Sequence, residues 1–313
     1  MPELRASRPE SQQPYLRHFV FQPGPSERNR TVYYALSFGV FVVVALALEA
    51  VVDSGLGALA LDNRALARAL EAVRERTDHV PWRWFFLFFA ISYGVIWVAL
   101  GAAVKLVHGR PILSLYTDRA RFDLKRAFSG FLLYTAIMVA PFAIFAAFGH
   151  SGLKPHFQPG PFFELLALSC MLLLVQTSTE EALFRGYLTQ FIATVTDSRA
   201  ILVFLPSLLF MFAHFGNPEV LRQPQILFFY FGFGVFTSLI VLRERGLELA
   251  IGAHFSNNLV NSVFARGDDS IFQTPAIFVL PTSVEATPLA VAFTGSFTPV
   301  IYWFLTAMLL RRR

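Results

Sequence analysis

The chain has 313 residues, of which 55% are hydrophobic and 15% are charged. A soluble domain carries about 25% charged residues, whereas here the charges stand between long apolar runs, as they do in membrane proteins. The net charge of +5 does not indicate nucleic-acid binding, because the basic residues lie at the ends of apolar runs and form no continuous patch. The single cysteine, Cys170, excludes an intrachain disulfide and a cysteine metal site.

Residues 1–30 are polar and contain five prolines, and they precede the first apolar run. We interpret them as a flexible cytoplasmic tail. The remainder, 31–313, is predicted to form one membrane domain.

Eight apolar runs follow the tail. A helix needs roughly 20 apolar residues to cross a hydrocarbon core of about 30 Å, and eight runs meet or approach this length. They are 31–52, 84–104, 130–148, 161–180, 200–215, 225–242, 247–265 and 288–310. The sequence therefore predicts an all-α, polytopic membrane protein with about eight transmembrane helices. The fifth run is short and contains Pro206, which predicts a kink in that helix.

Lysine and arginine are distributed unevenly between alternate loops. Of the 26 in the chain, 18 fall on the side that carries both ends of the chain and 8 on the other side. Cytoplasmic loops carry the excess of these residues, so both termini are predicted to be cytoplasmic. On the opposite side, Leu66, Leu70 and Val73 recur at helical spacing within 62–77. This pattern predicts an amphipathic helix, either in the membrane interface or solvated.

Two adjacent acids end the fourth apolar run. Neighbouring residues of a helix point about 100° apart, so Glu180 and Glu181 cannot share a face. Arg185 follows Glu181 by four residues, the spacing and order that favour an ion pair. Glu181 is therefore predicted to be neutralised, and Glu180, which has no partner in its own helix, is the candidate general base. The alternative is that both acids only fasten helices together.

Two histidines, His214 and His254, fall within apolar runs. A lone histidine on an apolar helix is more often a packed core residue than a catalyst. However, Glu180 and His214 are equally far in sequence from Asp197, so an antiparallel helical hairpin would bring them level.

A polar stripe marks the seventh run. His254, Asn257, Asn258 and Asn261 recur at the spacing of one helical face. Such a stripe on a membrane span must face protein or a water-filled cavity. For Asn257 and Asn261 taken individually, we favour hydrogen bonding between helices.

Three motifs occur in order on these runs: Glu180-Glu181-Ala-Leu-Phe-Arg185, Phe210-Met-Phe-Ala-His214 and His254-Phe-Ser-Asn-Asn258. They match the motifs Glu-Glu-x-x-x-Arg, Phe-x-x-x-His and His-x-x-x-Asn. Over about 160–265 the chain thus resembles the CAAX prenyl protease 2 group, also called the CPBP (CAAX protease and bacteriocin-processing) or Abi-domain family. The motifs of other intramembrane proteases, His-Glu-x-x-His, Gly-x-Ser-Gly and Gly-x-Gly-Asp, do not occur.

The resemblance implies an intramembrane endopeptidase that acts by Glu-activated water. Glu180 would activate the water, Glu181 would orient it and pair with Arg185, and His214 would help to bind or activate it. The resemblance implies that His254 and Asn258 polarise the scissile carbonyl and stabilise its oxyanion, with Phe210 in a structural role.

Metal use and substrate remain open at this point. Glu180, His214 and His254 would suit Zn²⁺ with an open position, but a metal-free glutamate mechanism is also argued for the family, and we favour it. The resemblance implies membrane-protein or lipidated-peptide substrates in the lipid bilayer, with prenylated C-terminal Cys-a-a-X proteins among them. The alternative function is a non-enzymatic membrane scaffold or immunity protein that retains the fold.

Overall fold

The computed structural model describes residues 31–74, 81–147, 154–267, 274–280 and 288–309, and in them the chain is mostly helical. The predicted tail, 1–30, lies outside the described residues. The helices in chain order are α2 (Thr31–Ala60), α3 (Arg64–Arg74), α4 (Trp82–Ala103), α5 (Leu124–Ala147), α6 (Pro159–Glu181), α7 (Thr189–Ile192), α8 (Arg199–Ala213), α9 (Pro218–Arg222), α10 (Leu227–Glu244), α11 (Glu248–Leu259) and α12 (Pro288–Leu309).

Wider π-helical turns continue three of these helices without a break. They are η2 (Val104–His108) after α4, η4 (Ala182–Leu188) after α6 and η6 (Val260–Phe264) after α11. Short 3₁₀ turns, η3 (Ile112–Leu115) and η5 (Pro224–Ile226), lie in the connections. Turns of the π type are frequent at functional sites, and η4 begins directly after the two adjacent acids.

Four helical segments are long and apolar enough to cross a membrane. They are Thr31–Ala60, Trp82–His108, Pro159–Ile192 and Pro224–Glu244, at four of the eight predicted runs. Helices form at the other four runs as well, but eight spans are not confirmed. The 15 residues of α8 reach about 22 Å at 1.5 Å per residue, which is less than a hydrocarbon core of about 30 Å. The chain is an integral membrane protein, and the sides of its termini stay predictions.

The helix predicted within 62–77 is confirmed as α3. The Asn63 side chain accepts hydrogen bonds from the backbone N–H groups of Ala65 and Leu66, at 3.0 and 3.1 Å, and so caps the helix. Leu66 is buried where α3 packs on α2, whereas Arg68 is exposed.

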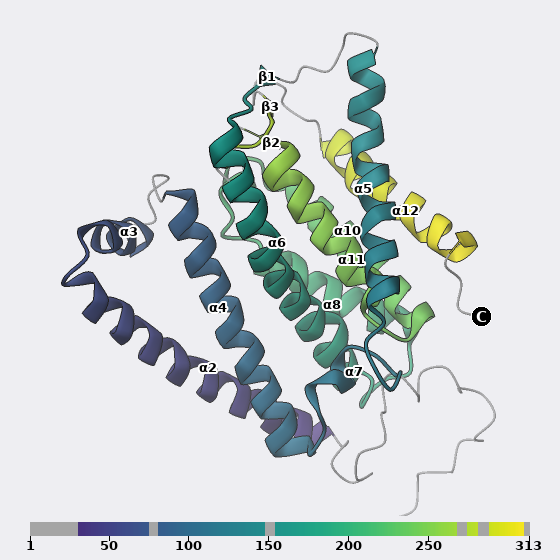
Figure 1. Cartoon of the computed structure of the whole chain (residues 1–313). Coiled ribbons are helices and arrows are strands. Elements are labelled where there is room, and N and C mark those ends of the chain that lie inside the picture. The colour runs from purple at the N-terminus through teal and green to yellow at the C-terminus, as the bar shows by residue number, and fades with distance from the viewer. Residues whose placement is uncertain (1–30, 75–80, 148–153, 268–273, 281–287, 310–313) are drawn as a thin grey trace, which may run out of the picture.

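The central helix of the bundle is α11, which lies between α5 and α6 and packs on both (Figure 1). A Cβ atom at Gly252 would lie 2.7 Å from the backbone nitrogen of Phe131 on α5, and one at Gly130 would lie 3.2 Å from the Cα of Leu249 on α11. Small residues allow helix backbones to approach in this way within a membrane. The close α5–α11 contact fixes α11 two residues before His254.

The other helices surround this core in pairs. α8 packs against α10, and α10 packs against α12, while α4 packs against α2 and α6. Pro206 lies inside α8, which continues through it, so the proline does not break the helix, and the kink stays a prediction.

A small sheet was not predicted. It has the strand order β1 (Lys154–Pro155), β3 (Phe278–Leu280) and β2 (Ala265–Gly267), with β1 antiparallel and β2 parallel to β3. Strands of two or three residues are too short to show the alternation by which a strand is recognised in a sequence. The sheet connects the chain after α11 to the chain before α6, next to the two helices that carry most of the candidate site.

Candidate active site

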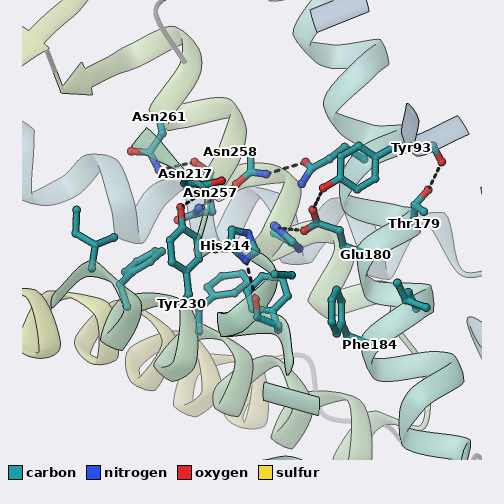
Figure 2. Close-up of a pocket in the computed structure, with 18 of the residues that line it drawn as sticks. Tyr93, Thr179, Glu180, Phe184, His214, Asn217, Tyr230, Asn257, Asn258 and Asn261 are labelled. Atoms are coloured by element: carbon teal, nitrogen blue, oxygen red, sulfur yellow. Dashed lines mark hydrogen bonds and ion pairs between the residues drawn. The ribbon is translucent and has the colours of Figure 1, made fainter. Parts of the chain in front are cut away.

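A cavity of about 560 Å³ lies among α4, α6, α8, α10 and α11. Four of the five catalytic candidates line it, namely Glu180, His214, His254 and Asn258, while Glu181 lies behind its wall. Figure 2 shows Glu180 and His214 directed into the same space from two different helices. The hairpin argument, which placed these two residues level with each other, is thus in accord with the structure.

Glu181 is fully buried, and its charge is balanced. Its Oε1 atom accepts hydrogen bonds from Arg185 Nη1 at 3.0 Å and from His254 Nδ1 at 2.8 Å. The predicted ion pair is therefore confirmed, and it satisfies the requirement that a buried charge be paired. The guanidinium of Arg185 lies 4.2 Å from the centre of the Phe210 ring, a cation–π contact that explains the structural role expected for Phe210.

Glu180 has a different environment from its neighbour. Tyr93 on α4 donates a hydrogen bond to its Oε1 atom. The Oε2 atom lies 3.5 Å from His254 Nε2 and has no hydrogen-bond partner among the residues that the structure describes. One oxygen of the carboxylate is thus held by Tyr93, and the other is buried without a hydrogen-bond partner in the described part of the chain, as Glu181 Oε2 also is; Glu180 differs from Glu181 in that it lines the cavity.

The hydrogen bonds of the two histidines indicate which ring nitrogen carries the proton. The Nδ1 atom of His254 faces a carboxylate and the Nδ1 atom of His214 lies 2.7 Å from the carbonyl oxygen of Phe210, so each Nδ1 carries a proton and donates it. In a neutral ring with its proton on Nδ1, the Nε2 atom is an acceptor. His214 also stacks on Tyr230 at 3.9 Å between ring centres, and Tyr230 donates to Glu219 Oε1 at 2.7 Å.

Asn258 is held by two other carboxamides. Its Nδ2 atom donates to Gln176 on α6 at 2.8 Å, and its Oδ1 atom accepts from Asn257 at 3.1 Å. Asn261 donates to the backbone of Asn257 in its own helix at 2.9 Å, and both side chains line the cavity. Among the described residues the interhelical bond is made by Asn258, and the interhelical hydrogen bonding favoured for Asn257 and Asn261 stays a prediction.

Tyr93, Gln176 and Tyr230 are site residues that the sequence analysis missed. Gln176 precedes Glu180 by one helical turn, and that spacing could have identified it. Tyr93 and Tyr230 stand in runs rich in phenylalanine, where nothing in the sequence separates a functional hydroxyl from an aromatic packing residue.

The proposed zinc ligands do not form a metal site in this arrangement. Among the described residues, no group of three or more His, Cys, Asp or Glu side chains is arranged to hold a metal ion. We derive no chemistry through a metal from these residues.

Comparison with known proteins shows what the motif-bearing segment is similar to. Residues 162–260, which hold all three motifs, match the family described as type II CAAX prenyl endopeptidase Rce1-like. The chain is also 29% identical over 194 residues to the uncharacterized protein YyaK of Bacillus subtilis (strain 168), over 61% of this chain and 64% of the relative. No solved structure matches the chain. The resemblance to the CAAX protease family, a family of membrane-embedded proteases, is thus confirmed over residues 162–260, the segment that carries most of the cavity residues.

Proposed function

We propose that the chain is an intramembrane endopeptidase that hydrolyses peptide bonds of membrane-associated or lipidated proteins with water activated by Glu180. One observation carries the proposal. Glu180 lines the cavity, and its carboxylate has one oxygen held by Tyr93 and the other without a hydrogen-bond partner among the described residues, 3.5 Å from His254 Nε2. A general base needs this combination of a fixed orientation and an available oxygen.

In the first step, a water molecule between Glu180 and His214 attacks the scissile carbonyl carbon. Its proton passes to Glu180 Oε2 while its oxygen bonds to the carbon, and the carbonyl oxygen becomes an oxyanion. The Nδ2 group of Asn258 uses one hydrogen for Gln176, and its second hydrogen is available to stabilise the oxyanion.

In the second step, the carbon–nitrogen bond breaks and the leaving amine takes the proton. That proton returns from Glu180, directly or through His254 Nε2. A protonated His254 would be stabilised by Glu181, to which its Nδ1 atom donates. The transfer leaves the net charge of the buried centre unchanged, because Glu180 becomes a carboxylate as His254 becomes an imidazolium.

The test is Glu180→Gln, which preserves the shape of the side chain and removes the base. We expect a loss of turnover of about 10²–10⁴-fold, measured as cleavage of apolar peptides by the purified protein and as substrate accumulation in membrane proteomes. The matched control is Glu164→Gln, the same change on the same helix at an exposed carboxylate that pairs with Arg83. The control should retain full activity.

Full activity in Glu180→Gln would reject the mechanism. The scaffold alternative expects no effect from either near-isosteric change, because a scaffold uses the shape of the membrane domain. Equal abundance of the two variants in the membrane shows that a loss of turnover is chemical.

A further inference from the structure

The two cavity histidines are oriented in different ways. Nδ1 of His254 donates to the carboxylate of Glu181, whereas Nδ1 of His214 donates only to the carbonyl oxygen of Phe210 in its own helix. His214 is also the residue that follows the last turn of α8, with φ −97° and ψ 5°. Rotation of the imidazole about that single hydrogen bond would move Nε2, the atom that faces the attacking water in the mechanism proposed above. Contacts from outside α8 are therefore needed to hold the ring.

Tyr230 of α10 provides such a contact. Its ring is stacked on the His214 imidazole, with 3.9 Å between the ring centres and 24° between the planes. The ring of Phe210 lies 4.5 Å from the centre of the same imidazole. Figure 2 shows Tyr230 beside His214, with Asn217 at the hydroxyl end of the tyrosine. Aromatic rings from two helices thus restrict the imidazole.

The hydroxyl group of Tyr230 is held as well. It donates a hydrogen bond to Glu219 Oε1 at 2.7 Å and accepts one from Asn217 Nδ2 at 3.0 Å. Asn217 Nδ2 also donates to Glu219 Oε1 at 3.1 Å, so the three side chains form a closed network. The backbone N–H of Asn217 donates to the carbonyl oxygen of His214 at 3.1 Å. The network therefore contacts His214 at its ring and at its backbone.

Packing alone does not require these polar groups. A phenylalanine at position 230 would cover the same face of the His214 ring. Glu219 is partly buried and lines the cavity, and removing a carboxylate from water is costly. A hydrogen bond from a phenol to a carboxylate is one of the stronger kinds. It fixes the position of the tyrosine ring along the imidazole, which a phenylalanine could not do.

We propose that Tyr230, anchored by Glu219 and Asn217, is a positioning residue that holds the His214 imidazole so that Nε2 faces the attacking water. The proposal rests on the endopeptidase function proposed above. It can fail while that function stands, because Glu180 would still activate water beside a less restricted imidazole.

The first test separates the tyrosine ring from its hydroxyl in the purified full-length protein, with cleavage of an apolar peptide as the measurement. Tyr230→Leu removes the stacked ring and should lower kcat about 10–100-fold with little change in KM. Tyr230→Phe keeps the ring without its anchor and should lower kcat about three- to tenfold. The control is Phe228→Leu, on the same helix at a side chain that is exposed and is not among those lining the cavity. It should retain the wild-type kcat. An unchanged kcat per folded molecule in Tyr230→Leu would overturn the proposal.

Variants of Glu219 test the anchor. Glu219→Leu removes the acceptor and should lower kcat as Tyr230→Phe does, whereas Glu219→Gln keeps an amide oxygen for the tyrosine and should recover part of the loss. Combining Glu219→Leu with Tyr230→Phe should cause no further fall, because the hydrogen bond is already absent. Equal losses in the two Glu219 variants, or additive losses in the combination, would overturn the role of Glu219 as the anchor.

A double-mutant cycle shows whether Tyr230 acts through the imidazole. In a His214→Ala background, Tyr230→Leu should change turnover by less than about twofold. A further fall as large as in the wild-type background would overturn the proposal. The cycle compares rates on one substrate and does not depend on which group is the base. Cleavage that persists in Glu180→Gln would therefore reject the proposed base, while the cycle still decides the positioning role.

A measurement without catalysis reports on the same contact. Diethyl pyrocarbonate modifies neutral imidazole nitrogens, and mass spectrometry locates the modified residues. His214 should react several-fold faster in Tyr230→Leu than in the wild type, because one face of its ring is uncovered, and His254 in the same sample is the internal standard. An equal rate for His214 would overturn the proposal. This result is obtained even if the wild-type protein cuts none of the peptides, which would count against the proposed function.

Discussion

Two clusters of buried polar side chains are each built around an arginine, and they differ in what balances its charge. Arg185 in η4 pairs with the carboxylate of Glu181, which His254 also contacts. Arg110, after α4, is 3% exposed and donates to two neutral acceptors, Tyr34 Oη at 3.0 Å and Gln190 Oε1 at 3.1 Å. Among the described residues no carboxylate forms an ion pair with Arg110.

The second cluster connects segments that are distant in sequence. Tyr34 belongs to α2 and Gln190 to α7, and Gln190 Nε2 donates to the backbone oxygen of Ser114 in η3 at 3.0 Å. The side chains of this cluster hold the connection after α4 against α2 and α7. The first cluster has instead a second carboxylate, Glu180, in a cavity. Buried polarity is thus common to both clusters, and a second carboxylate that lines a cavity distinguishes the one for which we propose catalysis.

The largest contrast is expected when each arginine is replaced by methionine, which keeps the aliphatic volume. Arg185→Met leaves Glu181 as a buried, uncompensated charge and should lower the free energy of unfolding by about 3–5 kcal/mol. Arg110→Met should cost about 1 kcal/mol, since Tyr34 Oη already lies 3.2 Å from Gln190 Oε1 and can donate to it. Unfolding of the two variants in detergent measures the difference. Equal losses would show that neutral acceptors hold a buried guanidinium as strongly as a carboxylate does.

The next contrast concerns one hydroxyl in each cluster. Tyr93→Phe removes the donor that orients Glu180. A hydrogen bond to a charged group is worth about 1.5–3 kcal/mol, so kcat should fall by about 10–100-fold with little change in KM. Tyr34→Phe removes a hydroxyl that contacts Arg110 and Gln190, and kcat per folded molecule should not change.

Steady-state kinetics on purified, folded fractions of both tyrosine variants provides the check. A purely packing role for Tyr93 predicts lower abundance and an unchanged kcat. A fall in kcat for Tyr34→Phe would show that the two clusters are coupled.

Local pairings could be predicted from the sequence, and distant ones could not. Glu181 and Arg185 lie one turn apart on one helix, so their spacing was sufficient. Tyr93 is 87 residues from Glu180, and Arg110 is 80 from Gln190, so these contacts depend on how whole helices pack. The number of membrane spans could not be predicted from the sequence either. Apolar runs located the helices, but apolar composition does not separate a membrane-crossing helix from a short one such as α8, which packs on α10.

The smallest structural change is the introduction of single cysteines in a Cys170→Ala background. Their reaction with a thiol reagent compares the accessibility of the cavity with that of the Arg110 cluster directly. Ala213 is exposed and lines the cavity, whereas Ser37 on α2 is fully buried next to Tyr34. Ala213→Cys should react with a small neutral thiol reagent while the protein is folded. Ser37→Cys, a nearly isosteric change, should react only after unfolding in SDS, which also shows that the thiol is present. Labelling of Ser37→Cys as fast as Ala213→Cys in the folded protein would mean that the Arg110 cluster is also open. The contrast between a reactive cavity and a closed structural cluster would then have to be abandoned.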